Sequence, residues 1–274
     1  MPRRVHSRVP EKRFRLGHFV LEFLSPATIY SLRNAGFDFV VFDMEHSGKG
    51  FSDLAFPVAL TRALGLGAIV RIPNKSADYI SRALDIGATG ILVPMVETKA
   101  EAAGVVAAAL YAPLGRRGVA LQIAHDEYRG GDAGEKLKGA NARTEILLQI
   151  ESVKGADNVD AIAGTPGVGG IWIGHYDLSV SQGIPGQFQD ARFTRAVARI
   201  ENICNSKKVD LARLGGTVDE CVDLVQRGYR HVAFSGDIWA LQASLVSASA
   251  AIRSCVAVPK ISPALKPVGK VVTQ

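Results

Sequence analysis

Two carboxylates, each placed where a short apolar run ends, are the residues of this sequence with the clearest chemical use. Glu151 follows the run at residues 147–150, and Asp177 follows the run at residues 170–176. The segment between them has helical spacing and ends at a Gly-Thr-Pro-Gly stop, which predicts a strand–helix–strand unit with parallel strands. Both side chains would then leave the same C-terminal edge of a sheet, where they could hold a divalent cation such as Mg²⁺ or Mn²⁺. The alternative is a pair of solvated loop carboxylates.

Three further polar side chains are candidates for the same site. Gln149 lies two residues before Glu151, so strand alternation points both side chains into one space. His46 follows the apolar run at residues 38–42, and because histidine side chains titrate near neutral pH it is a candidate general base. Asp85 could orient His46 if the second and fourth strand edges meet. The alternative for His46 is a core or capping histidine.

A guanidinium and a second histidine complete the set of candidates. Arg71 ends the apolar run at residues 67–70, and a cation there could stabilise a developing oxyanion. The alternative is a salt bridge from Arg71 to Asp43 or Glu45. His175, close to the second carboxylate, is either a third polar group of the site or a loop side chain.

The elements that must position these residues alternate between apolar runs and helical segments along the chain. We predict strands at residues 18–23, 38–42, 67–70, 90–94, 147–151, 170–176, 211–214 and 231–235, with helices between them and a final helix at 238–254. This alternation favours a single-domain (β/α)8 TIM barrel over an open doubly wound sheet. No G-x-G-x-x-G follows the first strand, which argues against a dinucleotide-binding fold. In such a barrel the active site lies at the C-terminal ends of the strands.

The net charge of +6 is concentrated at the two ends of the chain. We expect a basic N-terminal tail at residues 1–15, the barrel at residues 16–256, and a Pro/Lys-containing tail at residues 257–274. Basic tails can bind nucleic acid or an anionic surface, but a solvated chain end is the favoured interpretation, so no nucleic acid partner is expected. Residues 111–142 form a long glycine-rich stretch, which is either functional or carries short helices.

Cysteine usage and hydropathy suggest a cytoplasmic protein. The three cysteines form no C-x-x-C pair and are expected to be reduced. No apolar run reaches the length of a membrane span, and residues 1–15 lack the apolar core of a secretory signal, so no membrane partner is expected.

Five segments, in register along the chain, resemble the motifs of the HpcH/HpaI class II aldolase family. They are DMEH at residues 43–46, LVPMV at 92–96, PLGRRG at 113–118, LQIE at 148–151 and IGHYDLS at 173–179. The resemblance extends from about residue 17 to residue 250.

The resemblance implies an aldolase that depends on a divalent metal and makes or cleaves 4-hydroxy-2-oxo acids. Pyruvate and an aldehyde would be the partners of the reaction, which passes through an enolate. Glu151 and Asp177 would bind the metal, which is Mg²⁺ or Mn²⁺, with Co²⁺ as a further choice. His46 would be the acid/base, with Asp85 as its orienting partner.

The same resemblance assigns the substrate contacts. Arg71 would stabilise the enolate and hold the ketone, while Gln149 would contact the substrate. Backbone amides near Tyr176 would receive the substrate carboxylate. The family oligomer, a hexamer built as a trimer of dimers with exchanged C-terminal helices, would follow for the helix at 238–254.

The chain also departs from the family pattern. His175 and Tyr176 replace the usual Pro-Ala or Pro-Asn before Asp177, so the pocket there is expected to be narrower or to carry an extra proton donor. Ser47-Gly48-Lys49 replaces the common Ala-Pro after His46, so the part of the site that receives the aldehyde is expected to differ from that of the family.

Two other functions remain open from the sequence. A lyase acting on a CoA thioester, as in the related citrate lyase β-subunit group, would need a basic groove, which the 111–142 region could supply. A barrel without catalytic activity that binds a 2-oxo acid, or a partner protein through the basic tails, is the second alternative.

Overall fold

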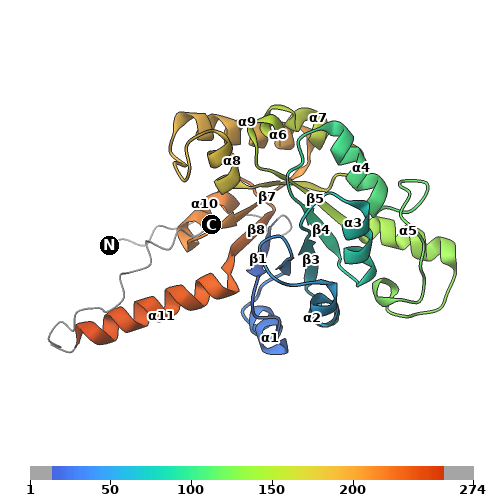
Figure 1. Cartoon of the computed structure of the whole chain (residues 1–274), viewed down its shortest axis with the longest axis horizontal. Helices are drawn as coiled ribbons and strands as arrows, with labels where there is room; N and C mark the ends of the chain where they lie inside the picture. The colour runs from blue at the N-terminus through green and yellow to red at the C-terminus, as the bar shows by residue number, and fades with distance from the viewer. Residues whose placement is uncertain (1–13, 256–274) are drawn as a thin grey trace.

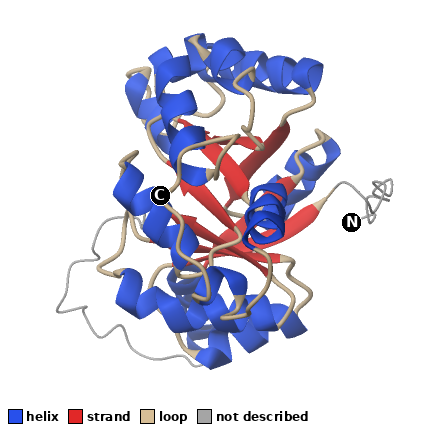
Figure 2. Cartoon of the chain, turned by 90° about the vertical axis from the view of Figure 1, so that its right-hand side faces the viewer, coloured by secondary structure: helices blue, strands red, loops and turns tan. Residues whose placement is uncertain are grey.

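The computed structural model describes residues 14–255 and shows a closed barrel of eight parallel strands wrapped by helices (Figures 1 and 2). The strands are β1 (Arg15–Val20), β2 (Phe39–Asp43), β3 (Gly67–Arg71), β4 (Gly90–Val93), β5 (Glu145–Ile150), β6 (Gly170–Ile173), β7 (Asp210–Gly215) and β8 (His231–Gly236). Each strand pairs in parallel with its neighbour in sequence, and β8 pairs with β1 to close the ring. The (β/α)8 prediction is confirmed.

Strand alternation divides the apolar side chains between two cores. One set points into the barrel, and includes Phe19, Phe39, Leu147 and Trp172; the other fills the space between strands and helices. Gly17 makes the interior possible, because a Cβ at this position would lie 2.2 Å from the ring of Phe39. The filled interior leaves the C-terminal mouth as the part of the barrel where polar side chains can gather.

Several of the helices begin where the sequence supplies a capping side chain. They are α1 (Pro26–Asn34), α2 (Phe51–Ala63), α3 (Ala77–Asp85), α4 (Lys99–Ala109), η2 (Ala124–Asp126), α5 (Ala133–Arg143), α6 (Val153–Asp157), α7 (Val159–Ala163), α8 (His175–Ser181), α9 (Ala191–Lys207), α10 (Val218–Gln226) and α11 (Asp237–Ser254). Side chains of Ser25, Ser76, Thr98, Asp190 and Thr217 accept a hydrogen bond from the first turn of the helix that follows each of them.

The largest differences from the predicted strand bounds lie in the first strand, predicted at 18–23 and found at Arg15–Val20, and in the sixth. The first strand begins at Arg15, whose amide donates to the carbonyl of Arg230, so this residue belongs to the barrel and not to the tail. The sixth strand ends at Ile173 instead of continuing to residue 176, because the chain turns into α8 at His175. Residues 1–13 of the predicted N-terminal tail and the whole predicted C-terminal tail, 257–274, lie outside the described residues.

The 111–142 region carries two short helices, η2 and α5, and lies at the N-terminal end of the barrel. It follows α4, which runs back along the barrel, and η2 lies against the end of α3, with the carbonyl of Ala124 accepting a hydrogen bond from Arg62 at 2.8 Å. Within one chain it is therefore far from the C-terminal mouth, and it cannot supply a groove there.

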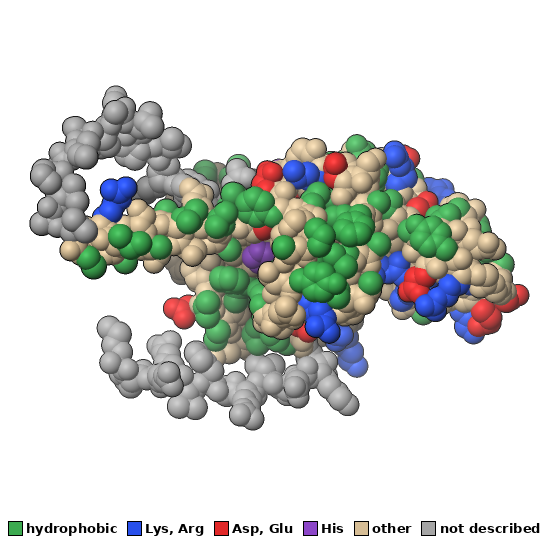
Figure 3. All heavy atoms as spheres, turned by 90° about the horizontal axis from the view of Figure 1, so that it is seen from below, with side chains coloured by type: hydrophobic (Ala, Val, Ile, Leu, Met, Phe, Trp, Pro, Cys, Tyr) green, Lys and Arg blue, Asp and Glu red, His purple; other side chains and the backbone are tan. Residues whose placement is uncertain are grey.

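The last helix, α11, begins at the C-terminal end of β8 and projects away from the barrel (Figure 1). The carboxylate of Asp237 fixes its start by accepting hydrogen bonds from the amides of Leu21, Glu22 and Phe23 at 2.6–3.1 Å. Beyond this anchor the helix exposes apolar side chains, which Figure 3 shows along the projecting arm. None of the helices within residues 14–255 is long and apolar enough to cross a membrane.

Candidate active site

A buried ion pair between β2 and β3 forms one side of the barrel mouth. The carboxylate of Asp43 accepts two hydrogen bonds from Arg71, at 2.9 Å from Nε and 2.5 Å from Nη2. The two residues are register partners in adjacent strands, so both side chains end at the same height. The guanidinium also lies over the ring of Phe19, 5.0 Å from its centroid. Arg71 is thereby held in a fixed orientation at the mouth.

The residues after Asp43 turn around its carboxylate. The amides of Glu45 and His46 donate to Asp43 Oδ1 at 3.0 and 3.4 Å. Glu45 Oε2 lies 3.3 Å from Arg71 Nη1 and 3.7 Å from His46 Nε2. The side chain of His46 is half exposed, which leaves its ring accessible from solvent. Arg71 therefore makes the salt bridges to both Asp43 and Glu45 that the sequence offered as an alternative to a catalytic role.

Glu151 forms the other side of the mouth and is held by two donors. Its Oε1 accepts from the amide of Met95 at 2.6 Å, and its Oε2 accepts from the side chain of Gln149. Met95 has φ of 55°, a left-handed conformation that turns its amide toward the carboxylate. Gly174 leaves the space that Glu151 occupies, because a Cβ at this position would lie 2.7 Å from Glu151 Oε2. The prediction that Gln149 and Glu151 share one space is confirmed.

The charge balance at the mouth fits a divalent cation. Burial raises the pKa of Glu45 to about 7, and repulsion from Glu151, Asp43 and Asp177 adds to this shift although Arg71 opposes it. Burial also raises the pKa of Glu151, with the charge of Asp177 as a further cause. Four carboxylates thus face one guanidinium, and a bound cation would relieve the excess negative charge.

Two buried oxygen atoms at the mouth also accept no hydrogen bond from any described residue: Gln149 Oε1, and Glu45 Oε2, which has only its ion pairs. Oxygen atoms of this kind suit a hard cation and the water around it. Within residues 14–255, no group of three or more His, Cys, Asp or Glu side chains could hold a metal ion. A cation here would take at most two protein carboxylates, and water or substrate would complete its coordination.

Asp177 lies in the first turn of α8, at the rim of the mouth, and is exposed. Its charge contributes to the raised pKa of Glu151, so the structure brings the two predicted metal ligands near each other. The pair comes from the C-terminal ends of β5 and β6, as the strand–helix–strand unit predicts.

Asp85 is not brought to His46 within this chain. It is the last residue of α3, and its Oδ1 accepts from Arg117 Nη2 at 2.6 Å. Because α3 runs antiparallel to the strands, its end lies at the N-terminal side of the barrel, whereas His46 follows the C-terminal end of β2. The predicted orienting contact is therefore wrong for a single chain.

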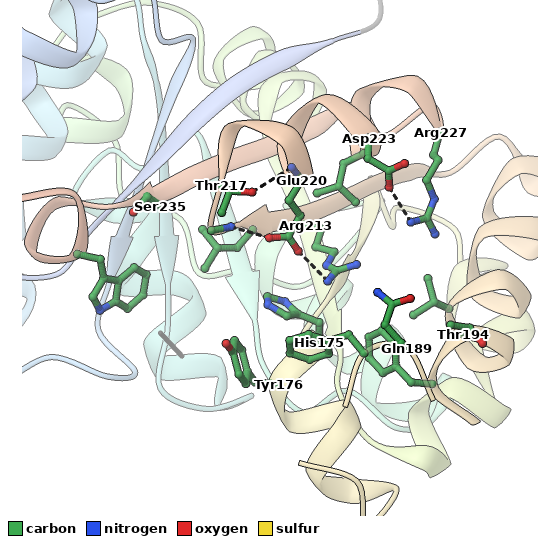
Figure 4. A pocket seen from close by; sticks show the side chains of 17 residues that line it. His175, Tyr176, Gln189, Thr194, Arg213, Thr217, Glu220, Asp223, Arg227 and Ser235 are labelled. Atoms are coloured by element: carbon green, nitrogen blue, oxygen red, sulfur yellow. Dashed lines mark hydrogen bonds and ion pairs between the residues drawn. The ribbon is translucent and has the colours of Figure 1, made fainter. Parts of the chain in front are cut away.

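The side chains of His175 and Tyr176 turn into a groove beside the mouth (Figure 4). Their rings contact each other and the ring of Phe188, with centroids 4.8–5.2 Å apart. Burial, and the nearby charge of Arg213, lower the pKa of His175 to about 3. Tyr176 lies in the first turn of α8, where backbone amides have no partner inside the helix.

Comparison with known proteins agrees with this geometry. The family model described as HpcH/HpaI aldolase/citrate lyase matches residues 15–241. The chain belongs to this family. A 5-keto-4-deoxy-D-glucarate aldolase of Escherichia coli is 37% identical over 178 residues, which cover 65% of this chain and 69% of the relative.

Two solved structures extend the likeness over the whole barrel. An HpcH/HpaI aldolase from Desulfitobacterium hafniense DCB-2 has a TM-score of 0.84 at 26% identity, covering 92% of this chain and 96% of that chain. An HpcH/HpaI aldolase/citrate lyase family protein from Burkholderia cenocepacia J2315 has a TM-score of 0.81 at 29% identity. This match covers 88% of the present chain and 95% of that chain. The chain is thus an enzyme of the aldolase type, and the resemblance found in its motifs is confirmed.

The sequence alone did not assign a role to several groups that build this HpcH/HpaI site. Asp43 and Glu45 were visible as polar residues at the end of β2 and just after it, but only their distances to Arg71 show that they orient it. The Met95 amide could not be found from residue type, since every residue except proline carries a backbone N–H. The proline before Met95 was the available signal, because it ends β4 and precedes the left-handed turn.

Proposed function

We propose that this enzyme is a divalent-metal-dependent aldolase that cleaves or forms 4-hydroxy-2-oxo acids, with pyruvate and an aldehyde as the partners. The observation that carries the proposal is the position of Glu151 and Asp177 opposite the Asp43–Arg71 pair at one barrel mouth. Two carboxylates on one side suit a cation, and a fixed guanidinium on the other suits a developing oxyanion.

The groups of the chain have distinct parts in this reaction. Glu151 and Asp177 would hold the cation, which supplies a Lewis acid that polarises the ketone of a 2-oxo acid. Arg71 would face the enolate oxygen, and Asp43 would keep the guanidinium aimed at it. His46 would take the proton of the 4-hydroxyl group during cleavage and return it during synthesis, because its ring is accessible and near the mouth.

The substrate contacts rest on groups around Glu151 and α8. Gln149 holds Glu151 through its amide nitrogen, and its unpartnered Oε1 is free to meet a substrate hydroxyl or a water. First-turn amides of α8 near Tyr176 would receive the substrate carboxylate, as the resemblance implies. The name of the Escherichia coli relative points to acid sugars as one class of 4-hydroxy-2-oxo acid to assay first.

Exchange of the pyruvate methyl protons in D₂O, followed by NMR, tests the enolate step without an assumption about the aldehyde. We expect exchange with Mg²⁺ or Mn²⁺, none after treatment with EDTA, and a loss of at least 100-fold in Glu151→Gln. Glu22→Gln is the matched control, since this carboxylate lies at the same rim on an exposed side chain. Full exchange in EDTA, or in Glu151→Gln, would contradict the metal assignment.

We also propose that the enzyme assembles as a homo-oligomer through α11, in line with the expected hexamer. A helix that projects from the barrel with exposed apolar side chains needs a partner surface to bury them. Light scattering on the purified protein would measure the mass directly, and a monomer at micromolar concentration would contradict this part of the proposal.

A further inference from the structure

A groove of about 780 Å³ runs from the barrel mouth outward between α9 and α10 (Figure 4). At its inner end lie Leu214 and Trp239, which also pack against the apolar side chains inside the barrel. At its outer end lie Thr194 and Arg227. A space of this volume holds a small organic molecule, and its inner end lies beside the first turn of α8 at the barrel mouth.

Aromatic rings form one wall of the groove. The rings of Tyr176, Phe188 and Phe193 follow one another, with successive centroids 4.9 and 5.2 Å apart. The ring of His175 lies against the first two, and Trp239 faces the inner end. Such a wall favours a flat, ring-bearing molecule, which can stack on it or meet it edge-on.

Two largely buried polar side chains, His175 in this wall and Arg213 beside it, carry nitrogen atoms that no described residue satisfies. The side chain of His175 makes no hydrogen bond to any residue in the 14–255 range, although the residue is only 8% exposed. Arg213, 5% exposed, donates through Nη2 to Glu220 Oε1 at 3.1 Å, but its Nε has no partner. Buried polar groups are usually hydrogen-bonded, so the unpaired Arg213 Nε, together with the nearby ring of His175 in Figure 4, points to a bound polar atom.

The charges of the groove are balanced, which restricts the ligand. Arg213 is paired with Glu220, and Arg227 is paired with Asp223 at 3.1 Å. A phosphate or pyrophosphate would meet the two carboxylates without an unpaired cation to hold it. This argues against a CoA thioester in the groove and favours an uncharged polar group such as a hydroxyl.

We infer that the groove binds the part of an acceptor aldehyde beyond its reacting carbonyl, and that it selects an aromatic ring bearing a hydroxyl group. The ring would lie along Tyr176 and Phe188, and its hydroxyl would meet His175 and Arg213. This specificity rests on the proposed aldolase function, whereas binding to the groove does not.

Acceptor selectivity tests the inference. The value of kcat/KM for 4-hydroxybenzaldehyde, divided by that for glycolaldehyde, is measured with pyruvate and Mn²⁺ in the full-length protein. Gln189→Phe places a ring inside the groove from an exposed loop position, and we expect it to lower this ratio at least tenfold. Gln187→Phe, exposed in the same loop but outside the groove, is the matched control and should keep the ratio within twofold.

A second readout does not depend on catalysis. The unreactive probe 4-hydroxybenzyl alcohol should quench tryptophan emission saturably, because Trp239 lines the groove, and the signal should be lost in Trp239→Phe. Saturable quenching without pyruvate exchange in the wild type would reject the proposed function but keep the groove as a binding site. No quenching in the wild type, or an unchanged selectivity ratio in Gln189→Phe, would overturn the inference.

Discussion

Asp43 and Arg71 form a two-point ion pair at the barrel mouth, and the carboxylate side of that pair is completely buried. The geometry follows from register, since β2 and β3 pair Asp43 with Arg71. Removal of one partner from a buried pair leaves an uncompensated charge, whereas loss of an exposed pair costs little. The pairing of β2 with β3 therefore fixes the orientation of the guanidinium.

Asp43→Asn is expected to lower both stability and enolate formation. The variant loses the charge that opposes Arg71, and we expect about 3 kcal/mol less free energy of unfolding in urea. Pyruvate methyl exchange should fall by at least tenfold, because the guanidinium can turn toward Glu45. Asp78→Asn, which breaks the exposed pair with Arg82, is the control and should change neither quantity measurably. Equal results for the two variants would contradict the role assigned to Asp43.

Gly174→Ala should weaken cation binding without greatly disturbing the barrel. The added methyl would lie 2.7 Å from both Cβ and Oε2 of Glu151, so this side chain would have to move. We expect the affinity for Mn²⁺, measured by electron paramagnetic resonance, to fall at least tenfold. Gly104→Ala, in α4 with nothing within 4 Å of the added Cβ, should leave the affinity unchanged and increase stability by about 0.5–1 kcal/mol. Wild-type affinity in Gly174→Ala would exclude Glu151 as a ligand.

His46→Gln should separate proton transfer from cation binding. A general base increases the rate by a factor of roughly 10²–10⁴, and we expect the variant to cleave a 4-hydroxy-2-oxo acid more slowly by a similar factor. The Mn²⁺ affinity should stay within twofold, because His46 contacts Glu45 and not Glu151. Glu22→Gln, exposed at the same rim, serves as the control, and cleavage at wild-type rate in His46→Gln would require another base.

The sequence predicted the parts of this molecule that depend on side-chain pattern. Apolar runs located all eight strands, and the spacing of Gln149 and Glu151 placed both on one face. The end of β6 was missed because no charged residue or proline follows Ile173 before Asp177, and Tyr176 in the first turn of α8 favours a strand by type. The prediction of an Asp85–His46 contact was wrong for a single chain because spacing along the sequence does not show at which end of the barrel a helix stops.

Other features had no signal in the sequence. Backbone groups such as the Met95 amide act through conformation, and a left-handed residue other than glycine cannot be read from its type. The groove depends on the separation of α9 and α10, which packing decides. From its type, Arg213 is expected to be a surface residue of a weakly predicted strand. In the structure it is buried beneath α9 and α10.

The apolar side of α11 should determine the oligomeric state. Leu241 and Leu245 lie one turn apart and are both exposed in the single chain. If they are buried between subunits, the double variant Leu241→Glu/Leu245→Glu should dissociate the assembly, because buried glutamates would be unpaired. Light scattering gives the mass, and Ala243→Glu, on the opposite side of the helix, is the matched control. An unchanged mass in the double variant would place the subunit interface elsewhere.

The ion pair between Asp126 and Lys136 should make the 111–142 region sensitive to acid. Burial raises the pKa of Asp126, but hydrogen bonds from Lys136 and the Gln122 amide lower it more strongly, to about 2. Because the folded pKa lies below the ordinary value, the pair stabilises the fold above pH 4, and this contribution is lost as the pH falls toward 2.

Asp126→Asn should therefore cost about 1–2 kcal/mol of unfolding free energy at pH 7, with the difference from wild type shrinking below pH 4. Glu127→Gln, an exposed neighbour, should show little difference at either pH. Denaturant unfolding between pH 2 and pH 7 makes the comparison, and a constant difference across this range would mean that Asp126 acts through packing instead of charge.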